Sequence, residues 1–191
     1  MTDKRLKEIL SSITILIDRR EHIDKHNHIL SYFDSVGIKY KYQSLRFGDY
    51  SFELPLIPEL NNLPNDSFEN SIVVERKMSL TEISGNLCNS KNPDGTIDDN
   101  RGRFERELQK SVDAKTKFVL MIEDGGGWQN IIDHKYDTEF NPAAFTATLF
   151  AFRERYGIHI DFVPKKFAGY YIYSCFKYHL RNYIQKLEAV A

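Results

Sequence analysis

Cysteine is scarce in this sequence. Its 191 residues include two cysteines, Cys88 and Cys175, which lie far apart and form no CxxC pair. This spacing argues against a disulfide scaffold and a zinc knuckle, and it is typical of a reducing cytoplasm, or of the host cytoplasm if the source is viral. Long hydrophobic runs are also lacking, because no segment approaches the roughly 18 apolar residues of a membrane helix or resembles a signal peptide. We therefore expect a cytoplasmic protein that does not enter a membrane.

An excess of one charge is lacking as well. The chain has 26 Lys and Arg against 27 Asp and Glu, for a formal net charge of -1. The total therefore gives no indication of nucleic-acid binding, and any basic surface must be local. Internal repeats are not evident, which sets repeat architectures aside. A chain of this length predicts one domain over residues 1–191, with a core over about 13–164 and a helical tail over 165–191.

Apolar residues recur with the periods of strands and helices. The predicted strands cover residues 13–18, 38–45, 47–54, 71–77, 117–123 and 158–163. The predicted helices cover residues 29–36, 79–88, 104–112 and 141–157, with a last helix in the tail from residue 165. The polar segments 54–70 and 89–100 are predicted to be loops. This order predicts an α/β fold in which a mixed central sheet is flanked by helices.

One predicted strand ends in Glu75, Arg76 and Lys77. Because strand side chains alternate, Glu75 and Lys77 leave one face and Arg76 leaves the other. Asp49 can bring a second carboxylate to that face if the preceding strand is a neighbour, and Gly48 lets the backbone bend there. Carboxylates hold hard cations such as Mg²⁺ or Mn²⁺, and a nearby lysine can stabilise a phosphorane. The pattern indicates phosphodiester hydrolysis, although salt-bridged strand faces are also ordinary.

Longer strings carry a resemblance to a known family. They are IDRRE at 17–21, LRFGDY at 45–50 and IVVERKMSLTEISGNL at 72–87, continued by RFERELQKS at 103–111, FVLMIED at 118–124 and, more loosely, TLFAFRERYGIHIDFVP at 148–164. In this order they resemble the XPF family of structure-specific endonucleases, whose core reads DxRE, GDY and VERKxxxD. The resemblance covers most of the chain.

The XPF resemblance implies a restriction-endonuclease-like fold, catalysis with Mg²⁺ or Mn²⁺, and cleavage of branched or flapped DNA. It implies that Asp18, Asp49 and Glu75 are metal ligands and that Lys77 is the catalytic lysine. The residues it places around them in supporting roles are Arg20, Glu21 and Arg76. We expect a stand-alone repair or recombination nuclease from a bacteriophage or bacterium, acting as a homodimer. The triple glycine at 125–127 lacks a following P-loop lysine, so no nucleotide cofactor is expected.

Two departures from the family pattern stand out. Thr81 occupies the position of the last acid of the VERKxxxD motif, and Glu82 follows one residue later. One step along a helix rotates a side chain by about 100°, so we expect Glu82 to act as the capping-box acid of a helix that starts after Ser79. The tandem helix-hairpin-helix module that usually follows such a core does not fit into residues 165–191.

Two segments are candidates for DNA contact. Arg101 and Arg103 can meet phosphates, but acids are interleaved with them, and a solvated salt-bridged helix face is an equal alternative. Lys165 and Lys166 open a tail that is rich in basic and aromatic residues and lacks acids as far as Lys186. This tail is predicted to contact the DNA backbone. Its apolar stripe through Phe176 is better explained by core packing or a dimer interface.

Two other functions stay open. One is a nuclease of the same fold with another substrate, such as a Holliday-junction resolvase or a restriction-type enzyme. The other is a non-catalytic subunit that binds DNA or a partner, which Thr81 favours. Against the second alternative, a decayed site has no chemical reason to keep three acids and a lysine.

Overall fold

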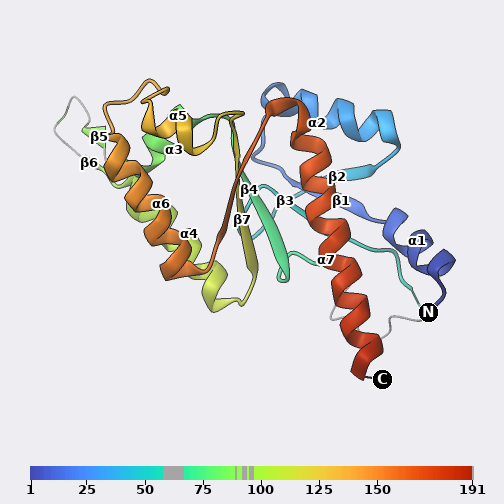
Figure 1. Ribbon diagram of the computed structural model, residues 1–191. Helices are drawn as coiled ribbons and strands as arrows, with labels where there is room; N and C mark the ends of the chain where they lie inside the picture. Colours follow the sequence, from blue (N-terminus) through green and yellow to red (C-terminus); the bar gives the residue numbers. More distant parts are fainter. Residues whose placement is uncertain (58–66, 89, 92–93, 95–96, 191) are drawn as a thin grey trace. The chain divides into compact units, whose positions relative to one another are not determined.

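The computed structural model of the protein describes residues 1–57, 67–88, 90–91, 94 and 97–190 (Figure 1). Most of the loop predicted over 54–70 lies outside the described residues. The chain divides into two compact units, one of residues 1–74 with 166–191 and one of residues 75–165. None of the helices within the described ranges is long and apolar enough to cross a membrane.

The first unit contains the N-terminal strands. They are β1 (Thr14–Asp18), β2 (Lys39–Gln43), β3 (Tyr50–Glu53) and the first half of β4 (Ile72–Lys77). Strand β1 pairs in parallel with β2 and antiparallel with β3, and Tyr50 of β3 pairs antiparallel with Val74 of β4. The condition set for Asp49, that β3 and β4 are neighbouring strands, is therefore met. The centre of β1 is fully buried, as expected for a strand between two others.

Helices α1 (Asp3–Ser11), α2 (Ile23–Val36) and α7 (Ala168–Val190) complete the first unit, in which α7 packs against α2 and α1 (Figure 1). The predicted tail helix is thus confirmed and belongs with the N-terminal strands. Its buried Phe176 lies 5.3 Å from the ring of Phe52, which also stacks on Phe68 at 4.3 Å between ring centroids. Helix α1 was not predicted, although Leu6, Ile9 and Leu10 have helical spacing.

The second unit contains the end of β4, then β7 (Lys117–Glu123) and β8 (His159–Val163), which pairs in parallel with β7. Its helices are α3 (Leu80–Leu87), α4 (Asn100–Asp113), α5 (Trp128–Ile132) and α6 (Pro142–Tyr156). The loop prediction over 89–100 is wrong in part, because β5 (Ser90–Lys91) and β6 (Ile97–Asp98) pair antiparallel. Like the unpredicted α5, these elements are too short to leave a recognisable period in the sequence.

Local sequence signals set several helix ends as expected. The side chain of Asn141 accepts hydrogen bonds from the amides of Ala143 and Ala144 at the start of α6. Gly157 ends α6 and Gly37 ends α2, both in the left-handed conformation that glycine adopts easily. Six strands in the order β2-β1-β3-β4-β7-β8 form one mixed sheet, so the predicted α/β class is confirmed.

Candidate active site

Asp18 ends β1 with its carboxylate almost completely buried, at 1% exposure. Its Oδ1 accepts hydrogen bonds from the Arg20 amide at 2.8 Å and from Arg20 Nε at 2.7 Å. Its Oδ2 accepts from Arg20 Nη2 at 3.1 Å and from the Leu45 amide at 2.8 Å. Burial alone would raise the pKa of Asp18, but the hydrogen bonds from Arg20 and Leu45 outweigh it and hold the pKa below 3.8. Arg20 thus contacts Asp18 directly, and its supporting role in the site stays a prediction.

Protonating Asp18 is expected to destabilise the fold. Because its pKa is lower when folded than when unfolded, Asp18 stabilises the protein above the unfolded pKa of about 3.9. That contribution is lost as the pH falls through the folded pKa. We expect Asp18→Asn to lower the free energy of unfolding by about 2 kcal/mol at neutral pH, and by less at pH values below about 4. Urea unfolding of both proteins across this pH range measures the difference in free energy of unfolding. A difference that does not become smaller in acid would contradict the prediction.

The peptide of Asp49 is held between two strands. Its amide donates to the carbonyl of Val74 on β4 at 3.0 Å, and its carbonyl accepts from the amide of Asp18 at 2.8 Å. The preceding Gly48 has a left-handed φ of 71°, and a Cβ there would lie 2.8 Å from Cβ of Val73. The predicted bend at Gly48 is therefore confirmed, and it delays the start of β3 to Tyr50.

A side chain at Gly48 is expected to disturb this turn. Gly48→Ala combines an unfavourable φ with contact against a buried strand, and we expect it to lower the free energy of unfolding by about 2 kcal/mol. Gly85→Ala is the matched control, because this helical glycine has nothing within 4 Å of an added Cβ and should be neutral or slightly stabilising. Equal denaturation midpoints for Gly48→Ala and Gly85→Ala would contradict the conclusion that the turn at residue 48 requires glycine.

Glu75 and Lys77 share a face of β4 as predicted. Lys77 Nζ donates to Glu75 Oε1 at 2.7 Å, and the two side chains are 8% and 10% exposed. The ammonium also lies 5.4 Å from the ring centroid of Phe104, within cation–π range. A carboxylate and an ammonium are thus held together in a largely desolvated place, where electrostatic interactions are strong.

Arg76 points away from this pair, as predicted, and binds Glu123 at the end of β7. Its Nε donates to Glu123 Oε1 at 2.7 Å, and the side chains of Arg76 and Glu123 are 2% and 1% exposed. This ion pair joins β4 to β7, and the supporting role of Arg76 in the site stays a prediction. Glu123 was not assigned a role from the sequence. The sequence feature that could have identified Glu123 is an acidic residue at the end of a strand that is otherwise apolar.

Glu21 contacts a buried histidine. Its Oε2 lies 3.5 Å from Nδ1 of His26, whose Nε2 is hydrogen-bonded to the hydroxyl of Tyr42 at 2.9 Å. The backbone at His26 departs from helical angles, with φ of -129° and ψ of 18°. The Glu21 amide also donates to the carbonyl of Asp18, so Glu21 contacts both β1 and α2. Its supporting role in the site stays a prediction.

The first turn of α3 carries the departure from the family motif. The hydroxyl of Thr81 donates to Asp137 Oδ2 at 3.3 Å and accepts from the Asp137 amide at 3.1 Å. Glu82 Oε2 accepts from the Met78 amide at 2.7 Å, and the Glu82 amide donates to Ser79 Oγ at 3.1 Å. The predicted capping role of Glu82 is confirmed. An acid distant in sequence contacts Thr81, which sequence reasoning did not anticipate.

A family model described as the ERCC4 domain matches residues 17–175. The chain belongs to the ERCC4 domain family. The matched range includes the residues predicted for the active site, from Asp18 to Lys77, and extends into α7. None of the proteins with curated descriptions matches this ERCC4 domain.

Solved structures show what the fold of this ERCC4 domain is similar to. XPF from Aeropyrum pernix is 18% identical with a TM-score of 0.54, over 84% of this chain and 58% of that one. XPF from Aeropyrum pernix in complex with DNA is 17% identical with a TM-score of 0.56, over 88% of this chain and 66% of that one. This likeness confirms the predicted fold, and the chain spans less than two thirds of those proteins' length.

The arginines predicted to contact DNA lie on the surface of α4 in this ERCC4 domain. Arg101 Nε donates to Glu105 at 2.9 Å, and Arg103 Nη2 donates to Asn100 Oδ1 at 3.5 Å. These contacts fit the salt-bridged alternative, and phosphate binding there stays a prediction. Lys165 and Lys166 are exposed, as a DNA-contacting role requires.

The predicted metal ligands of the ERCC4 domain come from both units, with Asp18 and Asp49 in the first and Glu75 in the second. Among the residues that the structure describes, no three His, Cys, Asp or Glu side chains are grouped so that they could hold a metal ion. The ligand set therefore stays a prediction.

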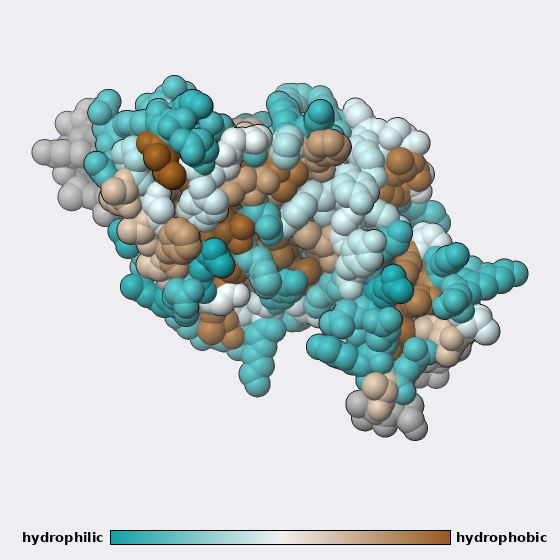
Figure 2. All heavy atoms as spheres, in the orientation of Figure 1, coloured by the Kyte–Doolittle hydropathy of each residue, from teal (hydrophilic) through white to brown (hydrophobic). Residues whose placement is uncertain are grey.

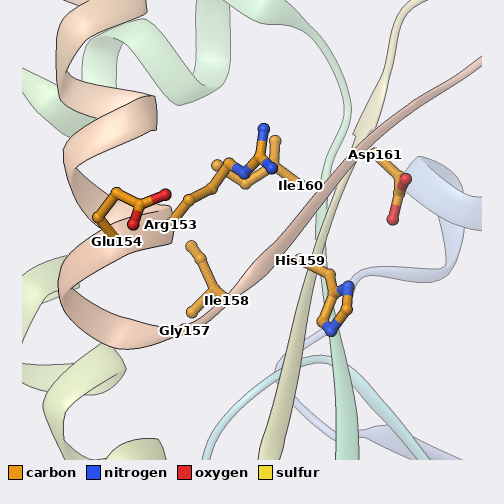
Figure 3. A pocket seen from close by; sticks show the side chains of 7 residues that line it. All are labelled: Arg153, Glu154, Gly157, Ile158, His159, Ile160 and Asp161. Carbon is orange, nitrogen blue, oxygen red and sulfur yellow. The ribbon is translucent and has the colours of Figure 1, made fainter.

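The second unit contains a pocket of about 320 Å³ (Figure 3). It is formed where α6 ends and β8 begins, and it is lined by Arg153, Glu154, Gly157, Ile158, His159, Ile160 and Asp161. Burial and the nearby cations Lys117 and Arg153 lower the pKa of His159, although Asp161 opposes them. Its lining contains none of the predicted catalytic residues.

Proposed function

We propose that this ERCC4 domain is a divalent-metal-dependent DNA endonuclease that hydrolyses phosphodiester bonds in branched or flapped DNA. Family membership supports the nuclease class. The observation that carries the proposal is local to β4. Asp49 is bonded through its amide to Val74, and the residue after Val74 is Glu75, whose carboxylate holds the ammonium of Lys77.

Asp49 and Glu75 suit a hard cation, because their donors are carboxylate oxygens, which Mg²⁺ and Mn²⁺ prefer. The two oxygens of Asp18 accept four hydrogen bonds, about the capacity of a carboxylate. We propose Asp49 and Glu75 as the ligands, on the chemistry of their oxygens, and Asp18 as a positioning residue. Its predicted ligand role requires Arg20, whose side chain is 75% exposed, to move away.

When bound, the ion would supply charge neutralisation at the phosphate and a more acidic water. The side chains of the protein would supply proton donation and positioning. Lys77 offers ammonium protons to a phosphate oxygen or to the attacking water, and its partner Glu75 keeps it on the same face of β4. Arg76 and Glu123 hold that strand against β7, so that the reacting groups are positioned in advance.

Cleavage of labelled DNA tests the proposal. The wild-type protein is incubated with a blunt duplex, a flap, a splayed fork and a four-way junction, each with Mg²⁺, Mn²⁺ or EDTA. We expect cutting of the flap or fork near the branch, cutting that EDTA abolishes, and little cutting of the duplex. Preference for the four-way junction would favour a resolvase. Light scattering tests the predicted homodimer.

A second candidate function is a non-catalytic subunit that binds DNA or a partner protein. The observation that favours it is Thr81, which pairs with Asp137 where the family motif has an acid. In that case the protein would bind branched DNA without cutting it under any metal condition. Roles in repair or recombination, a phage source and a cytoplasmic location stay predictions.

A further inference from the structure

Helix α7 presents two distinct faces. Its buried face consists of Ile172, Phe176, Leu180 and Ile184, which pack into the first unit. A second row of side chains is centred about 120° around the helix from that face. We call this row the α7 outer stripe. It consists of Tyr170, Tyr178 and Arg181, which are exposed, and Ser174 and Lys177, which are half-buried. Figure 2 shows the face over α7 as mostly pale to hydrophilic, with few strongly apolar residues.

Two aromatic rings of the outer stripe are open to solvent. Tyr170 is 55% exposed and Tyr178 is 59% exposed. The rings of Tyr170 and Tyr32 of α2 are perpendicular, at 6.3 Å between centroids and 86° between planes, so the two rings do not stack in parallel. Eight residues of helix separate the two tyrosines by about 12 Å. They can therefore receive two different bases of one strand.

The cations of the outer stripe lie in a segment without acids. Lys177 and Arg181 are one helical turn apart, and no Asp or Glu occurs between Lys165 and Lys186. The next acid of the helix, Glu188, is paired with the N-terminal amine at 2.6 Å. A chain with net charge of -1 thus concentrates positive charge beside exposed aromatic rings. Phosphates and base faces together complement such a surface.

We propose that the α7 outer stripe binds single-stranded nucleic acid, with bases stacked on Tyr170 and Tyr178 and backbone phosphates at Lys177 and Arg181. The inference rests on the proposed function in one respect, since it takes the ligand to be the single-stranded arm of the branched or flapped substrate. Paired duplex DNA keeps its base faces stacked, so it gains nothing from the tyrosine rings.

Ring removal tests the stacking. Fluorescence anisotropy follows the binding of a labelled oligothymidylate to the full chain in EDTA, so that cleavage plays no part. We expect the Tyr170→Ala, Tyr178→Ala double variant to bind about 30-fold more weakly or worse, because each stacked base contributes appreciably. The Tyr170→Phe, Tyr178→Phe double variant keeps both ring faces and should bind within about threefold of wild type. The alanine and phenylalanine double variants should bind a blunt duplex with equal affinity.

Salt dependence tests the phosphate contacts. Lys177→Gln should reduce the slope of log K against log salt by about 0.7, the value for one phosphate contact to a single strand. Lys186→Gln removes the same charge from an exposed position of α7 outside the stripe, and its slope should equal that of wild type. Identical slopes for both variants would overturn the assignment of Lys177.

Three results would overturn the proposal as a whole. The first is that the Tyr170→Ala, Tyr178→Ala double variant binds oligothymidylate as tightly as wild type. The second is that this variant loses as much affinity for the blunt duplex as for oligothymidylate. The third is that it has a smaller molar mass than wild type while its DNA binding is unchanged, which would assign the stripe to a protein partner. The outcome is independent of catalysis. Failure of metal-dependent cutting leaves the binding result intact, and failure of the binding result leaves cutting intact.

Discussion

Asp49→Asn is expected to lower metal-dependent cleavage by on the order of 10³-fold. Asparagine keeps the shape of the side chain, and the backbone contacts of residue 49 to Asp18 and Val74 involve only its peptide. The fold should therefore survive. The lost property is the negative charge that attracts a hard cation. Cleavage rates of a labelled flap or fork in Mg²⁺ and Mn²⁺ measure the effect, with circular dichroism and thermal unfolding as checks on the fold.

Asp24→Asn is the matched control for this prediction, because it makes the same change at an exposed position in the first turn of α2. It should cut like wild type. Asp49→Asn should still bind the substrate in EDTA, since one repulsive charge toward phosphate is removed. Metal-dependent products at wild-type rates from Asp49→Asn would refute the assignment of Asp49 as a ligand.

Arg76→Met is expected to lower the free energy of unfolding by about 3–5 kcal/mol. The methionine approximates the length of the arginine stem but cannot neutralise Glu123, whose side chain is 1% exposed. A carboxylate in such a place is costly without its guanidinium partner. Replacing both residues, as Arg76→Met with Glu123→Leu, should recover most of the loss. Urea denaturation at neutral pH measures all three proteins.

Arg101→Met is the control for Arg76→Met, because its ion pair with Glu105 lies on the surface of α4. It should cost no more than about 0.5 kcal/mol. If Arg76→Met costs no more than Arg101→Met, then the buried pair does not stabilise the fold. If the double variant is as unstable as Arg76→Met, then lost packing and not an uncompensated charge explains the effect.

The strand β4 illustrates what could be predicted from the sequence. The alternation of side chains along a strand is a property of its own backbone, so the common face of Glu75 and Lys77 and the opposite direction of Arg76 followed from their spacing. Helix ends at Gly37, Asn141 and Gly157 followed likewise from residues within one turn. The short elements α5, β5 and β6 escaped prediction because two to five residues do not establish a period.

The partners of the site residues could not be predicted in this way. The contacts of Asp18 with the Leu45 amide, of Arg76 with Glu123 and of Thr81 with Asp137 join positions that are far apart in the chain. Nothing in the local pattern around Arg76 indicates which acid it binds. The joining of α7 to the N-terminal strands was equally inaccessible, because the apolar stripe shows that the helix packs but not against what.

Local patterns were enough to establish the types and order of most elements, the residues that share one face of a strand, and the family resemblance that the ERCC4 domain match confirms. These depend on short-range periodicity and on the identity of residues. Long-range packing established that the carboxylate of Asp18 accepts four hydrogen bonds, that Arg76 is paired with Glu123, and that Tyr170 and Tyr178 of α7 are exposed. These depend on which distant segments pack together, since burial and pairing are set by neighbours that the linear chain does not identify.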